Sequence, residues 1–374
     1  MKLSVNFLLK ILVIIYTILL ILKSILNQLT YDEAYTYLNY VLTKNYFNIG
    51  LANNHLLNTI LIAFTTKFSS QEFYIRLPNI IFGVIFVISV YLYSLRSKYP
   101  ILSFFIIISS PRMFDFFTLG RGYGISTTLL FLAFFIFFKT NFRFKYFISY
   151  WLLLLSSLSI NIYIVVFFVF VLVTFKEQVI YNSKYLFFNY IISIFPVFIV
   201  CKTVFTISTE GKPLYGFETI ELTYQFKTFF GLVATYGIEG LIIEIIVTVS
   251  LLSLFYKNIR FVNNQIWLIF IISIILLYSL PFLFGRPFPG GRLLLPLLSI
   301  FLFTVVEMVN FVEIKALSKL LIIFYLIFNF MINFSFNETR DWEIVNICNY
   351  PYVSEYYEIY KFKNFEEKCI GNNF

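Results

Sequence analysis

Long apolar runs separated by short polar stretches dominate this chain from residue 3 to residue 334. A helix needs roughly 20 apolar residues to cross the hydrocarbon core of a bilayer, and runs of about that length recur along the chain. The pattern therefore predicts an all-α, polytopic membrane protein with about eleven transmembrane helices. The predicted crossings are 3–22, 78–95, 100–116, 122–138, 146–160, 161–175, 185–205, 240–256, 265–284, 293–309 and 316–334.

One further apolar run, residues 56–68, is too short for this role. It holds about 13 residues, whereas a perpendicular crossing requires roughly 17. Counting it as a crossing would also move every later basic loop to the other side of the membrane. We therefore predict an interfacial or re-entrant helix here, and a short tilted crossing is the alternative.

The first apolar run, residues 3–22, has two interpretations. It is either an uncleaved membrane anchor or a cleaved signal peptide, which would have an unbroken apolar core followed by small residues at the cleavage site. Lys10 interrupts the run, and no small-residue cleavage site follows Lys23. These two observations favour the anchor.

Basic residues fall in alternate loops. If the N-terminus is cytoplasmic, each short basic loop lies on the cytoplasmic side, as the positive-inside rule requires. The same orientation places the loops 23–77, 206–239 and 285–292 outside. A polar tail, residues 335–374, follows the membrane region 1–334 on that side. The cytoplasmic cations are Arg96 and Lys98, Lys139, Arg143 and Lys145, Lys176 and Lys184, Lys257 and Arg260, and Lys315 and Lys319.

Composition excludes several classes of protein. Hydrophobic residues occupy 60% of the 374 positions and the mean hydropathy is +0.86, which a compact soluble domain cannot hide beneath a polar surface. The net charge of +9 is spread over short loops, so nucleic acid is not an expected partner. Three cysteines and one histidine leave no cluster able to hold zinc. We predict no cofactor and no metal site, with a divalent metal left open.

An adjacent pair of carboxylates, Asp32 and Glu33, stands shortly after the first apolar run. Only 13% of the residues are charged, and acidic side chains beside a bilayer are costly. One interpretation is that the pair belongs to an active site at the outer membrane surface. The other is that it caps a helix beginning near Ala34, because acids favour a helix N-terminus.

Several further motifs lie on the predicted outer side. Guanidinium groups bind phosphate oxygens bidentately and stay charged at any working pH, so the arginines are candidates for phosphate binding. Arg121 lies between two glycines, which let a backbone approach a ligand closely. Arg76 has a simpler interpretation as a cation that snorkels to the interface, and a loop hydrogen bond is the simpler role for His55. The candidate binding residues are His55, Arg76, Arg121, Tyr123 and Arg292.

The order and spacing of these motifs resemble those of the GT-C superfamily of polyprenyl-phosphosugar-dependent glycosyltransferases. The similarity is to the bacterial branch related to protein O-mannosyltransferases and to the aminoarabinose transferases of lipid A. Those enzymes carry Asp-Glu in the first outer loop, then His- or Lys-Pro-Pro-Leu, and then Arg-Leu-Pro. This chain has Asp32-Glu33, Asn54-His55-Leu56-Leu57 without the two prolines, and Arg76-Leu77-Pro78. The resemblance covers about residues 3–140 and, beyond them, an Arg292-to-Pro296 element.

The resemblance implies a membrane glycosyltransferase of the bacterial plasma (inner) membrane with its active site on the outer face. Its donor would be a polyprenyl-phosphate-linked sugar, and its acceptor a hydroxyl of a glycan, lipid or protein. Such a transfer needs a base for the acceptor proton and cations for the phosphate charge. Asp32 would be the base of an inverting reaction, and Glu33 would be a structural or acceptor-orienting partner. The donor and its phosphate would be bound by His55, Arg76, Arg121, Tyr123 and Arg292.

Two other classes of function remain as alternatives. A lipid-linked glycan flippase or other transporter is expected to carry ionisable or Gly/Pro-broken positions near helix midpoints. Here the charges lie at predicted helix ends, apart from Glu244 and Lys202. A polysaccharide polymerase or ligase is expected to use a large outer loop with arginine and histidine instead of an early Asp-Glu. These contrasts favour the glycosyltransferase.

Overall fold

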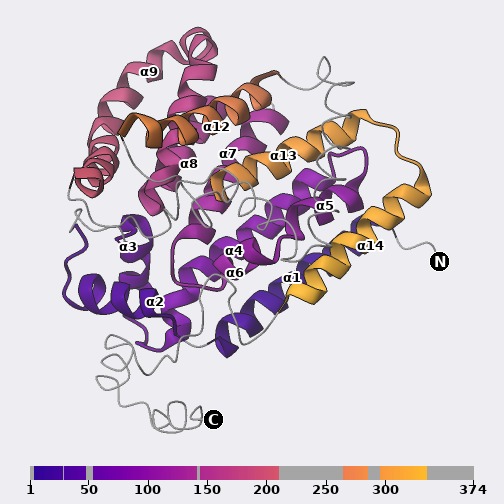
Figure 1. Cartoon of the computed structure of the whole chain (residues 1–374), viewed down its shortest axis with the longest axis horizontal. Helices are drawn as coiled ribbons and strands as arrows, with labels where there is room; N and C mark the ends of the chain where they lie inside the picture. Colours follow the sequence, from indigo (N-terminus) through magenta and orange to yellow (C-terminus); the bar gives the residue numbers. More distant parts are fainter. Residues whose placement is uncertain are drawn as a thin grey trace.

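The computed structural model describes residues 4–27, 29–47, 54–140, 144–209, 264–284 and 295–334. These residues form helices and, within those ranges, no strand, so the predicted all-α class is confirmed (Figure 1). The helices are α1 (Val5–Leu26), α2 (Tyr31–Thr36), η1 (Tyr37–Leu42), α3 (Leu56–Thr65), α4 (Glu72–Ser94), α5 (Pro100–Ile108), α6 (Pro111–Phe117), α7 (Tyr123–Lys139), α8 (Lys145–Ser159), η2 (Asn161–Tyr163), α9 (Ile164–Thr209), α12 (Asn264–Phe284), α13 (Leu295–Phe311) and α14 (Ala316–Asn333).

Helix length and hydropathy identify fewer membrane spans than the sequence predicts. Among the described residues, α1 and α4 are long and apolar enough to cross a membrane, and the bent pair α5–α6 makes a third span if it is counted as one. Shorter apolar helices include α7, α13 and most of α14. The predicted total of about eleven crossings is therefore not confirmed by helix length.

The predicted crossing 100–116 is two helices in the structure. α5 and α6 meet at an angle of 68°. Pro111 is the first residue of α6, where a missing N–H costs least, and the Ser110 hydroxyl accepts a hydrogen bond from the Met113 N–H at 3.3 Å. The sequence therefore starts a new helix at this point instead of continuing the old one.

Other segments differ less from expectation. The run 56–68 forms α3, a helix of 10 residues, in agreement with a helix too short for a perpendicular crossing. The predicted helices 161–175 and 185–205 share one helical element, α9, whose ribbon changes direction in Figure 1. The predicted crossing 240–256 lies outside the described residues.

The core lies between α4, α7, α8 and α13. α7 packs against α4, α8 and α13, while α9 packs against α8. α1 packs against α4, and α14 packs against α5 (Figure 1). Aromatic side chains fill the centre: the ring of Phe303 on α13 lies 5.8 Å from that of Phe131 and 5.9 Å from that of Phe134. This packing holds together helices that are distant in the sequence.

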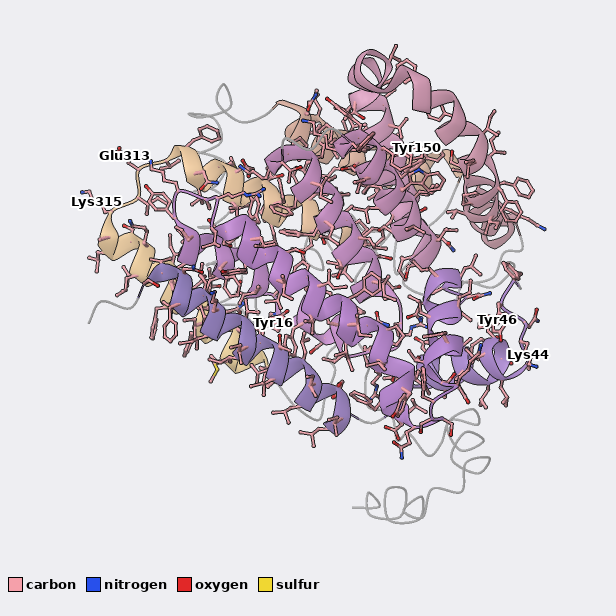
Figure 2. The ribbon with its side chains drawn as sticks, turned by 180° about the vertical axis from the view of Figure 1, so that it is seen from behind. Tyr16, Lys44, Tyr46, Tyr150, Glu313 and Lys315 are labelled. Atoms are coloured by element: carbon pink, nitrogen blue, oxygen red, sulfur yellow. The ribbon has the colours of Figure 1, made fainter. Side chains whose placement is uncertain are left out.

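Three of the predicted cytoplasmic loops meet at one end of the molecule. Arg96 donates from Nη1 to the backbone carbonyl of Lys139 at 2.7 Å, which joins the α4–α5 and α7–α8 connections. The Tyr99 hydroxyl donates to the Val312 carbonyl at 3.0 Å, which adds the α13–α14 connection. Figure 2 shows Glu313 and Lys315 at this end, and Lys44 at the opposite one. Three of the five predicted basic loops thus form one spatial cluster.

Candidate functional site

Asp32 and Glu33 are consecutive residues of helix α2, and their side chains point to different neighbours. It begins with a capping box, in which the Thr30 hydroxyl accepts from the Glu33 N–H at 3.3 Å and Glu33 Oε2 accepts from the Thr30 N–H at 2.9 Å. The capping interpretation is therefore confirmed for Glu33, although the helix begins at Tyr31 and not near Ala34. Successive residues of a helix point about 100° apart, so Asp32 faces a different neighbour.

Glu33 forms a buried, bidentate ion pair with Arg76 of α4. Arg76 Nε lies 2.8 Å from Glu33 Oε1 and Nη2 lies 3.0 Å from Oε2, and both side chains are fully buried. The Gly120 N–H also donates to Oε1, at 2.7 Å. Burial acts to raise the pKa of Glu33, but the Arg76 charge and these hydrogen bonds outweigh it and leave the pKa below its usual value. Glu33 is thus held as a carboxylate.

Arg76 also binds the end of α1. Its Nη1 donates to the carbonyls of Ser24 and Asn27, at 2.9 and 2.7 Å. These carbonyls belong to the last turn and the C-cap of α1, where a helix leaves such acceptors unsatisfied. One guanidinium therefore joins α1, α2 and α4. This geometry favours a structural role for Arg76 over the phosphate-binding role that the resemblance implied.

Asp32 faces Arg121. Arg121 Nη2 lies 3.2 Å from Asp32 Oδ2, and only 7% of the Asp32 side chain and 1% of the Arg121 side chain are exposed. Arg121 stands in the loop between α6 and α7, so the pair joins that loop to α2. The structure therefore brings together the predicted base and one predicted phosphate ligand.

Backbone contacts fix the loop that carries Arg121. Asn58 Nδ2 donates to the Gly120 carbonyl at 2.9 Å, and Ser159 Oγ donates to the Gly122 carbonyl at 2.9 Å. Gly122 has φ +76°, and a Cβ added there would lie 2.7 Å from Ser159 Oγ. Glycine is needed here because a side chain would be strained and would collide. The glycines beside Arg121 thus allow close protein packing, which differs from the close approach to a ligand that the sequence suggested.

His55 and Tyr123 lie side by side near the same loop. Their rings meet edge-on with centroids 5.7 Å apart, and both residues are buried. His55 directly precedes α3, which begins at Leu56 without the two prolines of the related motif. Tyr123 begins α7, two residues after Arg121. The missing prolines therefore have not prevented a helix from starting after His55.

Two buried hydroxyl residues on α2 and η1 were missed in the sequence analysis. Thr36 ends α2, and Tyr40 lies on the π-helix η1 that continues it. The Thr36 hydroxyl has no hydrogen bond of ordinary geometry to the described residues, and the Tyr40 ring meets that of Tyr35 edge-on, with centroids 5.8 Å apart. Burial and the neighbouring Tyr35 raise the pKa of Tyr40, while the charge of Arg121 lowers it, so the hydroxyl stays protonated. No sequence pattern indicated this π-helix, a form that often occurs at functional sites.

A third buried ion pair joins the end of α1 to α6. Lys23 Nζ at the end of α1 lies 2.5 Å from Asp115 Oδ1 of α6. The Lys23 side chain is 1% exposed. A lone lysine and a lone aspartate in apolar runs were the available signals for this pair, since buried charges require partners.

One predicted phosphate-binding residue and two predicted outer segments fall in parts of the chain that the structure does not describe. Arg292, the segment 285–294 and the tail 335–374 lie outside the described residues. Within the described residues, no group of three or more His, Cys, Asp or Glu side chains could hold a metal ion.

Comparison with known proteins adds no relative. No family model matches this chain, and no curated protein or solved structure matches it. The function is therefore inferred from the sequence motifs and from the contacts of Asp32, Glu33, Arg76 and Arg121.

Proposed function

We propose that this protein is a membrane glycosyltransferase that moves a sugar from a polyprenyl-phosphate donor to an acceptor hydroxyl. One observation carries the proposal: Asp32 lies 3.2 Å from Arg121 on two segments that the Glu33–Arg76 pair and Gly120 hold in place. A base beside a phosphate-binding cation is the arrangement that this transfer requires.

The proposed reaction is a single inverting displacement. Asp32 accepts the proton of the acceptor hydroxyl as its oxygen attacks the anomeric carbon, and the bond from that carbon to the phosphate oxygen breaks. The lipid phosphate leaves with the bonding electrons, and Arg121 stabilises the charge that grows on it. His55 and Tyr123 are proposed to contact the donor from beside the Arg121 loop, and Arg292 is a further proposed phosphate ligand. Glu33 and Arg76 position α2.

We further propose a multi-pass protein of the bacterial plasma membrane with about eleven crossings, a cytoplasmic N-terminus and an outer active site. Arg96, Lys139 and the α13–α14 connection meet at one end of the molecule. Lys44, in the segment that follows η1, lies at the other end (Figure 2). Basic clusters favour the cytoplasmic side, so the proposed site lies outside.

A deletion strain tests the proposed activity. Mass spectrometry of its surface glycans and glycolipids is expected to show the loss of one defined sugar relative to the parent strain. An unchanged profile in the deletion strain would contradict the proposal.

Thiol labelling tests the proposed orientation. Cysteines that replace Ser183 and Ser318, in a background without native cysteines, are expected to resist a membrane-impermeant reagent in intact cells. Cysteines that replace Ser208 and Ser335 are expected to react with it. The opposite pattern would reverse the sidedness of the site, and reaction at position 65 would show that α3 returns to the outer surface.

A lipid-linked glycan flippase is the second candidate. It is favoured by the 68° break between α5 and α6 and by the buried Lys23–Asp115 pair, whose aspartate lies on α6. Broken helices and buried ionisable residues often mark transport pathways. A deletion strain lacking a flippase would lose the whole glycan instead of one sugar, so the same mass spectra separate the two candidates.

A further inference from the structure

The end of the molecule opposite to Lys44 carries an excess of positive charge. The described residues of the stretches 95–99, 139–145 and 307–319 contain six cations and two carboxylates. One of those carboxylates, Glu307, is paired with Lys139 at 2.8 Å, and the other, Glu313, is exposed. Four positive charges are therefore not balanced by an acid in these stretches. The cations are Arg96, Lys98, Lys139, Lys145, Lys315 and Lys319.

Tyr99 holds two of these lysines at one surface. Lys319 Nζ lies 4.5 Å from the centroid of the Tyr99 ring, and Lys98 Nζ lies 5.3 Å from it. The ring itself is fixed, because its hydroxyl donates to the Val312 carbonyl at 3.0 Å and accepts from the Ile314 N–H at 3.2 Å. The two ammonium groups are thus at most about 10 Å apart, which is about one screening length, so both attract an anion placed between them.

Two helix N-termini add to this positive potential. α5 begins one residue after Tyr99, and α14 begins one residue after Lys315. The N-terminus of a helix carries partial positive charge, which acidic residues in the first turn usually offset. Neither α5 nor α14 has an acidic residue in its first turn. The complementary partner for this surface is an anion.

An exposed apolar stripe runs along α14 on the face opposite to Lys319, which stands two residues, or about 200°, from both Leu317 and Leu321. Its residues recur every three or four positions, which places them on one face of the helix, and each is between 52% and 68% exposed. The stripe covers 15 residues, and its 14 rises of 1.5 Å make about 21 Å, which exceeds the roughly 15 Å of one leaflet. The stripe is therefore long enough to face the acyl chains of one leaflet. The stripe residues are Leu317, Leu321, Phe324, Phe328 and Met331.

We propose that this surface is a binding site for an anionic phospholipid, with the headgroup phosphate between Lys98 and Lys319. Charge complementarity selects an anionic headgroup. The exposed apolar face of α14 places this charged end at the level of lipid headgroups, which favours a lipid over a free anion. The proposal is independent of glycosyl transfer, since the surface lies at the end opposite to Lys44 and η1 (Figure 2). It predicts that lipid charge, more than lipid chain, decides binding.

Native mass spectrometry of the full chain in detergent tests the site, with phosphatidylglycerol and phosphatidylcholine of equal chain length as probes. The wild type is expected to retain phosphatidylglycerol preferentially. The double variant Lys98→Gln/Lys319→Gln is expected to bind it roughly 10- to 30-fold more weakly, since each lysine near a lipid surface contributes a severalfold effect. Lys98→Arg/Lys319→Arg keeps both charges and is expected to preserve the preference.

The matched control is Lys44→Gln/Lys67→Gln, which removes two exposed lysines from other parts of the chain with the same change in net charge. It is expected to bind phosphatidylglycerol like the wild type. Equal retention of the two lipids by the wild type would overturn the proposal. So would equal losses in the two glutamine variants, because net charge alone would then explain the binding.

Discussion

Replacement of Asp32 by asparagine is expected to lower sugar transfer by about 10²- to 10⁴-fold, the range for loss of a general base. The amide keeps the shape of the side chain, but it cannot take the proton of an acceptor hydroxyl. Arg121 keeps an oxygen acceptor at the position now 3.2 Å away, so the segments around it are expected to stay in place. The variant is expressed in the deletion strain, and the amount of the missing sugar that returns is measured by mass spectrometry. This amount is divided by the amount of folded variant in the membrane.

Asp115→Asn is the matched control for this experiment. It makes the same chemical change in another buried aspartate that pairs with a cation, here Lys23 at 2.5 Å. If loss of a buried ion pair were the cause of the defect, the two variants would lose transfer to a similar degree per folded protein. Full transfer by Asp32→Asn would refute the assignment of Asp32 as the base.

The helices could be predicted wherever one apolar run forms one element. The predicted segments 146–160 and 265–284 correspond closely to α8 and α12, because an apolar run of this length has few ways other than a helix to satisfy its backbone. The prediction failed at 100–116, where hydropathy continues through Ser110 and Pro111 although the helix does not. Pro111, a residue type that favours the first position of a helix, was the sequence signal for a new helix at this point.

The sequence predicted that four candidate residues lie close together, but it did not predict which of them pair with each other. The motifs pointed to Asp32, Glu33, Arg76 and Arg121 as one cluster, and the structure brings all four together in two ion pairs. Which carboxylate pairs with which arginine depends on the orientation of α2 and on the path of the 118–122 loop. These are long-range contacts, and no local spacing encodes them. No local pattern in the sequence predicts the π-helix with Tyr40 either.

Loss of either partner of the Glu33–Arg76 pair is expected to destabilise the protein severely. Removing one partner of a buried ion pair leaves an uncompensated charge and costs about 3–5 kcal/mol. Glu33→Gln and Arg76→Gln are each expected to lower the thermal unfolding temperature in detergent by many degrees. The double variant is expected to lose less than the sum of the single losses, because its remaining groups are neutral.

Glu72→Gln is the control for this effect, since the Glu72 carboxylate lies near the same guanidinium, at 4.0 Å, and is 14% exposed. Glu72→Gln is expected to lower the free energy of unfolding by no more than about 1 kcal/mol. A Glu33→Gln protein as stable as Glu72→Gln would show that the buried pair does not hold α2 in place.

The pH dependence of the same variants provides an independent check with a definite sign. Because the pKa of Glu33 in the folded protein lies below its usual value of 4.5, the pair stabilises the fold above pH 4.5. This contribution is lost as the pH falls through the lowered pKa. The difference in unfolding temperature between wild type and Glu33→Gln should therefore be constant from pH 5.5 to 7.5 and shrink below pH 4.5. A difference that grows on acidification would mean that Glu33 is protonated in the folded protein, and Arg76 would then need another counter-charge.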